Sequence, residues 1–78
     1  MATAYVLINC DLGYEEFVIS ELKEIETVRE VRGVLGVYDI LVKLEAGSFD
    51  EISKTIILKI RKFDKIRFTM TLNTIKGQ

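Results

Sequence analysis

Hydrophobic and polar positions alternate with different periods along the first third of the chain. Residues 4–10 form a short apolar run with branched and aromatic side chains, which is typical of a buried strand. Asp11-Leu12-Gly13 interrupts this run, and from Tyr14 to Ile25 the apolar residues recur at helical spacing. We therefore expect a strand over 4–10 and a helix over 14–25.

The pattern predicts two further strands between residues 27 and 45. The segment 27–34 carries valines at every third position among charged residues, which indicates a half-exposed strand with an irregularity. Beyond Gly36, residues 37–45 alternate with a period of two. That alternation places Tyr38 on the core face and Asp39 on the opposite face.

The second helix has a clear start signal. Ser48 and Glu51 have the spacing of a capping box, in which each side chain satisfies a backbone amide of the other residue. Behind them the apolar residues recur at intervals of four, and we expect phenylalanines to close the two ends of this stripe. The expected core stripe is Ile52, Ile56 and Ile60, with Phe49 and Phe63 at its ends.

The last strand, residues 66–72, alternates strictly between apolar and polar residues. Its apolar side chains should face one way and its polar side chains, among them Thr69 and Thr71, the other. The element order is then strand, helix, strand, strand, helix, strand. It predicts one α+β domain over residues 1–78 with the ferredoxin-like βαββαβ fold, in which both helices cover one face of a four-stranded antiparallel sheet.

The other face of the sheet should carry more apolar surface than a solvated face needs. The residues expected there are Tyr5, Leu7, Leu41, Thr69 and Thr71. Packing between the sheets of two copies would bury them, and we favour such a dimer over an ordinary half-exposed face.

Composition bounds the function classes. The chain has 78 residues, one cysteine, no histidine and a net charge of −1, so it lacks the basic excess expected of a nucleic-acid-binding domain. The basic cluster between Lys59 and Arg67 has only Phe63 and Phe68 beside it, and both are expected in the core. No signal peptide and no apolar run of membrane-spanning length is evident, so we expect a cytoplasmic protein.

Catalytic constellations are scarce in this sequence. Without histidine the commonest general base is missing, and Cys10 lacks a residue that would activate it. No glycine-rich nucleotide-binding pattern occurs, and a lone cysteine disfavours a metal site. We expect no enzyme, no catalytic residue, no metal and no cofactor.

Asp39 is the most informative candidate for chemistry. A carboxylate at the start of an apolar strand is either a solvated strand-end acid or one that awaits a cationic partner. Gly33 and Gly36 can expose backbone amides beside it. Amides and a carboxylate together suit a zwitterion, whose ammonium group would contact Asp39.

The chain resembles the ligand-responsive RAM domain of the Lrp/AsnC transcription regulators over about residues 3–75. The resemblance rests on four segments: Ala4–Ile8, Gly36-Val37-Tyr38-Asp39, Lys59-Ile60 and Thr69–Leu72. Full-length members carry an N-terminal helix-turn-helix domain, whereas here the resemblance begins at residue 3, so we expect a stand-alone RAM protein without direct DNA binding.

The resemblance implies sheet-to-sheet dimers that assemble into rings, an octamer among them, with amino-acid effectors bound between dimers. It places Gly36, Tyr38 and Asp39 in that cleft, with Leu35 beside them and Thr69 and Thr71 as weaker candidates. Leu35 stands where relatives often have a threonine or another polar residue. Full-length Lrp/AsnC regulators or metabolic enzymes are the implied partners.

The leading hypothesis is therefore an amino-acid-binding oligomerisation module that modulates transcription regulators or enzymes through assembly. The first alternative is a purely structural oligomerisation module without a ligand. The second is a small dimeric enzyme, since ferredoxin-like dimers also host enzymes and fold alone does not decide function.

Overall fold

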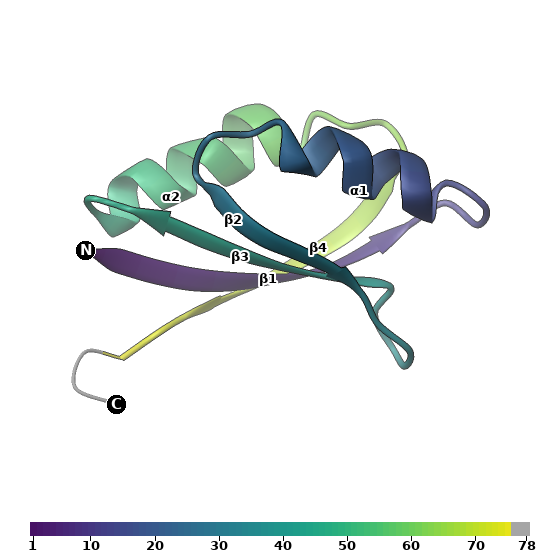
Figure 1. Ribbon diagram of the computed structural model, residues 1–78, viewed down its shortest axis with the longest axis horizontal. Helices are drawn as coiled ribbons and strands as arrows, with labels where there is room; N and C mark the ends of the chain where they lie inside the picture. The colour runs from purple at the N-terminus through teal and green to yellow at the C-terminus, as the bar shows by residue number, and fades with distance from the viewer. Residues whose placement is uncertain (76–78) are drawn as a thin grey trace.

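Four antiparallel strands form one sheet, and two helices cover one of its faces (Figure 1). The computed structural model describes residues 1–75. The strands are β1 (Ala2–Cys10), β2 (Val28–Gly33), β3 (Ile40–Ala46) and β4 (Ile66–Asn73). The helices are α1 (Glu15–Lys23) and α2 (Phe49–Thr55), and α2 continues directly into the π-helical segment η1 (Ile56–Ile60).

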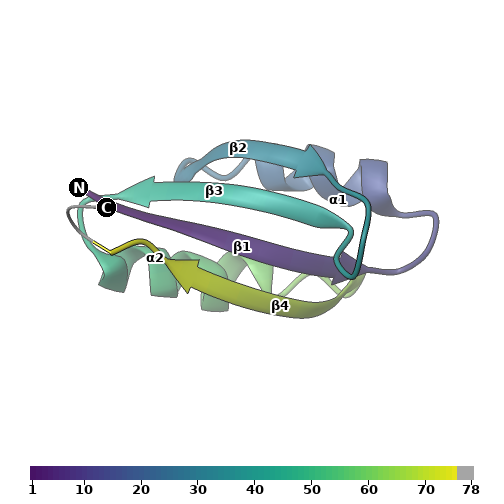
Figure 2. The same cartoon turned by 90° about the horizontal axis from the view of Figure 1, so that it is seen from below.

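The strand order is β2-β3-β1-β4, with β1 and β3 in the centre (Figure 2). Along both central strands buried residues alternate with half-buried ones, because one face packs on the helices and the other lies open. The predicted α+β ferredoxin-like fold is confirmed. We call the uncovered side the open face and the other the helix face.

The two helices supply the second layer of the core. In α1, Val18 and Leu22 are buried, whereas Tyr14, expected to begin the helix, lies just before it and is 42% exposed. Glu15 and Glu16 occupy the first turn, where the helix dipole favours acids. Within residues 1–75 no helix has both the length and the apolar character needed to cross a membrane.

The start of α2 shows one half of the expected capping box, since the Ser48 Oγ accepts a hydrogen bond from the Glu51 amide at 3.3 Å. Among the described hydrogen bonds, the reciprocal one from the Ser48 amide to the Glu51 carboxylate does not occur. Ile52, Ile56 and Ile60 are buried as predicted. Phe63 is half-buried against the core, but Phe49 is exposed and does not close the stripe.

The π-helical turn of η1 was not predicted. There the Arg61 amide donates to the Ile56 carbonyl at 2.8 Å, a bond that spans five residues where an α-helix spans four. The turn therefore sets where the Arg61 side chain leaves the helix end.

The irregularity expected in the second strand is a bulge at Arg29. Val28 lies opposite Leu44 and Val31 opposite Val42, and the register shifts between Val28 and Glu30. Two valines three positions apart can share a face of a strand only if one extra residue lies between them. The bulge thus turns both valines toward the helix face.

A second bulge, at Arg67, changes the faces of β4. Cys10 lies opposite Ile66 and Asn9 opposite Phe68, so Arg67 is the extra residue. Partners in an antiparallel register point to the same face, and the open face therefore receives the residues opposite Asn9, Leu7 and Tyr5. These residues are Phe68, Met70 and Leu72.

Thr69 and Thr71 consequently lie on the helix face, opposite the fully buried Ile8 and Val6. Their predicted place on the open face was wrong, because strict alternation was assumed from Ile66 onward. Phe68 was also misplaced: it is 51% exposed and does not belong to the core.

The burial pattern predicts that the same substitution lowers the free energy of unfolding by different amounts at two isoleucines. Ile40 is fully buried and Ile57 is 57% exposed. We expect Ile40→Val to lower the free energy of unfolding by about 0.5–1.5 kcal/mol and Ile57→Val to change it by less than about 0.5 kcal/mol. Urea denaturation measures both, and equal losses would contradict the assignment of the core.

Candidate functional site

The connection between β2 and β3 projects from one end of the sheet (Figure 1). It is closed by the Val34 amide, which donates to the Asp39 carbonyl at 2.9 Å. Gly36 has φ +142°, a conformation that other residues adopt only with strain. Leu35 is fully exposed and Val37 nearly so, which leaves two apolar side chains at the tip of this turn.

Asp39 is held against the end of the central strand β1. Its amide donates to the Ile8 carbonyl at 2.9 Å, and its Oδ2 accepts a hydrogen bond from the Cys10 amide at 3.1 Å. Asp39 precedes β3, which begins at Ile40, so the expectation of a strand residue on the open face was wrong. Its partner is a backbone amide, which was neither of the two alternatives considered from the sequence.

The Asp39 carboxylate keeps one oxygen available. No described residue donates a hydrogen bond to Oδ1, and the side chain is only half-buried. The bond from Cys10 orients the carboxylate, so Oδ1 can accept a hydrogen bond without a further loss of side-chain freedom.

Carboxylates gather around this end of β1. Burial, followed by the negative charges of Asp39, Glu15 and Asp11, raises the pKa of the Cys10 thiol. The Asp11 carboxylate lies 3.5 Å from the Arg67 guanidinium, while the Glu15 Oε1 accepts from the Gly13 amide at 3.1 Å. The local potential is negative and favours a cationic group.

A cleft of about 340 Å³ lies between the turn and the start of α1. Its lining residues are Glu15, Gly33, Val34, Leu35 and Asp39. Within the described chain, the amides of residues 35–38 donate no backbone hydrogen bond. Of these residues only Leu35 lines the cleft, so the site combines two carboxylates with one free amide donor and can contact both charged ends of a zwitterion.

Tyr38 belongs to the open face. Its ring stacks on Phe68 with centroids 6.2 Å apart, and its hydroxyl donates to the Met70 Sδ at 3.5 Å. The predicted core position of Tyr38 was wrong, because the residue precedes β3 and does not follow the alternation of that strand.

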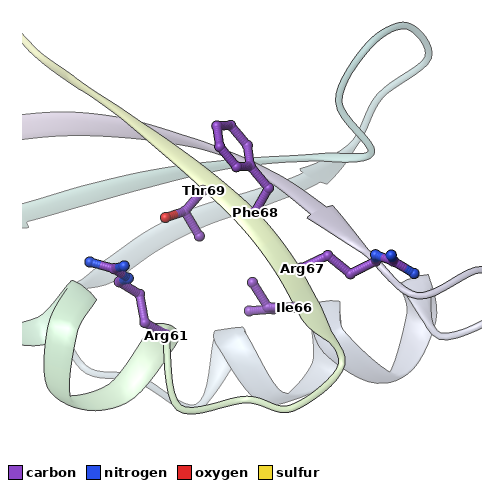
Figure 3. Close-up of a pocket in the computed structure, with 5 residues that line it drawn as sticks. All are labelled: Arg61, Ile66, Arg67, Phe68 and Thr69. Carbon is purple, nitrogen blue, oxygen red and sulfur yellow. The ribbon is translucent and has the colours of Figure 1, made fainter.

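The structure brings together only some of the predicted site residues. Leu35 and Asp39 line one cleft, with Gly36 and Tyr38 in the same turn. Thr69 and Thr71 lie apart, because they line cavities beside the helix end, and Figure 3 shows Thr69 and Phe68 on opposite sides of β4. Glu15 was missed as a site residue because its place in a first helical turn already explained it.

The open face carries the expected residues of β1 and β3. Leu7 lies opposite Leu41 and Tyr5 opposite Lys43, and all four are half-buried. The bulge at Arg67 adds three large apolar side chains from β4, namely Phe68, Met70 and Leu72, each about half exposed in the single chain.

Comparison with known proteins identifies relatives of two kinds. An uncharacterized helix-turn-helix-type transcriptional regulator of Pyrococcus furiosus is 36% identical over 74 residues, which are 90% of this chain and 49% of the regulator. A homocitrate synthase of Sulfolobus acidocaldarius is 38% identical over 74 residues, which are 94% of this chain and 16% of the enzyme. The chain thus spans about half of the regulator and a small part of the enzyme.

Among solved structures, the crystal structure of FFRP-DM1 is 35% identical and superposes with a TM-score of 0.92 over 96% of this chain and 100% of its own. The family model described as the Lrp/AsnC ligand binding domain matches residues 3–78. This chain therefore belongs to the Lrp/AsnC ligand-binding-domain family.

Proposed function

We propose that this chain is a non-enzymatic domain that binds an amino acid or a closely related small molecule and responds through assembly. The observation that carries the proposal is the Asp39 carboxylate, fixed by the Cys10 amide at 3.1 Å and lining the cleft beside the turn. The effector's ammonium group bonds the free Oδ1 of Asp39. Its carboxylate accepts from the amides of the turn between Leu35 and Tyr38.

The electrostatics of the cleft support a ligand that carries an ammonium group. The same carboxylates that raise the pKa of the Cys10 thiol, those of Asp39 and Glu15, line the cleft. A cation lowers the repulsion between them, whereas a purely anionic ligand raises it.

The relatives support a role that is not restricted to DNA-binding proteins. The chain matches part of a transcriptional regulator and also part of a metabolic enzyme. A domain found beside such different activities is expected to supply a shared property, and effector binding is one. Full-length regulators of the family and metabolic enzymes are therefore the partners we propose.

The open face supports dimerisation as the first step of assembly. Tyr5, Leu7 and Leu41 join the three apolar side chains of β4 there, and face-to-face packing of two sheets would bury this surface at about 25 cal/mol per Å². Dimers then build a ring. A ligand held between dimers favours the ring by the difference between its affinities for the two states.

A purely structural module is the second candidate. Leu35 and Val37 make the tip of the turn apolar, and such a tip can pack on another copy without a ligand. Under this alternative the domain assembles identically with and without amino acids.

The bulge in β4 makes a sharp prediction for the dimer. Met70 lies on the open face, and its neighbour Thr71 lies on the helix face. We expect Met70→Lys to convert the dimer to a monomer in analytical ultracentrifugation, because a buried ammonium group at the interface is costly. Thr71→Lys is the matched control and should leave the dimer intact. Equal effects of the two variants would contradict a dimer formed through the open face.

Ligand binding is tested by thermal shift of the purified protein against the common amino acids. At about 100 times its dissociation constant, an effector adds about 2.7 kcal/mol to the free energy of unfolding, which is several degrees for a domain of this size. We expect a selective shift with one class of amino acid.

Two substitutions separate the structural and binding roles of Asp39. In Asp39→Asn an amide oxygen can still accept from the Cys10 amide, but the negative charge is lost, so we expect wild-type stability without the ligand-induced shift. Asp39→Ala should also lose about 1–3 kcal/mol of stability, because the Cys10 amide is left without its acceptor. A wild-type ligand response in Asp39→Asn would refute the assigned role, and no shift with any amino acid would favour the structural module.

A further inference from the structure

The two edges of the sheet are protected very differently. β2 has six residues, contains the bulge at Arg29, and carries an ion pair between Glu30 and Arg32. Short length, a bulge and charges are the features that keep an edge strand from pairing with other chains. β4 has eight residues, and no charge lies between Phe68 and Asn73. Among the described strands it pairs only with β1.

The register of β4 shows which backbone groups point away from the sheet. The Thr74 amide donates to the Thr3 carbonyl at 3.1 Å, so these two residues form a hydrogen-bonded pair. Hydrogen-bonded and non-hydrogen-bonded pairs alternate along an antiparallel ladder. The amides and carbonyls of Thr69, Thr71 and Asn73 therefore point outward from the free edge.

Two cavities line this edge on its helix side. Each has a volume of about 260 Å³, and both include Arg61 at the end of the helix. The first is lined by Arg61, Ile66, Arg67, Phe68 and Thr69, and Figure 3 shows Arg61 and Thr69 on the same side of β4. The second is lined by Ser53, Ile56, Ile57, Arg61, Thr71 and Asn73. Together we call them the edge groove.

The charge of the edge groove is positive. Its lining includes two arginines and no acidic residue, although the whole chain has a net charge of −1. No described carboxylate lies within ion-pair distance of Arg61, while Arg67 is 3.5 Å from Asp11. Ile56 and Ile57 supply an apolar wall beside the guanidinium group of Arg61.

We propose that β4 and the edge groove bind an extended, acidic segment of a partner protein as a fifth strand of the sheet. The partner's backbone pairs with the outward groups of Thr69, Thr71 and Asn73. Its side chains alternate between the two faces. Those on the helix side enter the groove, where a glutamate carboxylate bonds Arg61 and the methylene groups of the same side chain contact Ile57. This surface is separate from the Asp39 cleft and shares only Phe68 with the open face, so a dimer with bound effector can still pair through the outward backbone groups of β4.

The two parts of this recognition have different roles. Main-chain hydrogen bonds to a strand edge give affinity for any extended peptide, and the pockets beside the edge give selectivity. Because the pockets here are basic, the acidic side chains of the segment decide which partner binds.

The test is a titration of the full chain with a fluorescein-labelled eight-residue peptide, carboxyfluorescein-Thr-Val-Glu-Val-Glu-Val-Thr-Val-amide. We expect saturable binding that weakens with added salt and falls at least about tenfold when the glutamates are replaced by glutamines. Two further peptides carry N-methyl groups on the odd or on the even backbone amides. Only one of them should lose binding, because only alternate amides of a strand face β4.

Matched protein variants assign the binding to the groove. Arg61→Glu should abolish it, whereas Lys62→Glu, the same charge reversal at a residue that lines neither cavity, should retain it. Thr71→Pro removes one outward amide and should also abolish binding, with circular dichroism and melting temperature showing that the variant is folded.

Several results would overturn the proposal. They are the absence of binding at millimolar peptide, equal binding of both N-methylated peptides, and equal losses in Arg61→Glu and Lys62→Glu. A further one concerns the protein's own assembly: if Thr71→Pro lowers the oligomer size and no peptide binds, the edge belongs to a second copy. None of these readouts depends on an amino-acid effector, so failure here leaves the proposed effector site untouched.

Discussion

Strand β1 pairs with β3 on one side and with β4 on the other, and these pairings determine on which face of the sheet each residue of β3 and β4 lies. Ala4, Val6 and Ile8 are fully buried beneath the helices, and β3 and β4 take their registers from this strand. Because side chains alternate along a strand, a shift of one residue exchanges the two faces. The bulge opposite the end of β1 is such a shift. It keeps Ile66 in the core while sending Phe68, Met70 and Leu72 to the open face.

The two bulges explain why one edge strand was read correctly from the sequence and the other was not. In β2 the valines Val28 and Val31 have a spacing that alternation forbids, so the sequence itself signals an extra residue. In β4 both Ile66 and Phe68 are apolar, and an unbroken pattern hides the bulge at Arg67. The order of elements and the buried stripes of the helices were predictable, because they depend on local periodicity. The faces of β4 were not, because they depend on its pairing with Asn9 and Cys10.

Part of the candidate site was predictable for a similar reason. An acid at the start of an apolar strand needs a partner, and this singled out Asp39. The partner itself, the Cys10 amide, is 29 residues away and becomes available only because β1 ends beside the turn. The approach of Glu15 to the same cleft also depends on where α1 begins after β1. Such tertiary neighbours leave no periodic signal in the sequence.

In the proposed function, adjacent residues of one turn connect the effector site with the open face. Asp39 turns toward β1 and the cleft, while Tyr38 turns the other way and stacks on Phe68. Tyr38 also contacts Met70, and both Phe68 and Met70 lie where the second sheet would pack, so in the proposed function a ligand that moves this turn acts on the dimer surface through Tyr38. Coupling between two sites requires a structural element with two arrangements, and binding at each site must shift the equilibrium between them. In the proposed function the turn between β2 and β3 is that element, whereas the edge groove lies beyond β4 and shares no residue with the turn.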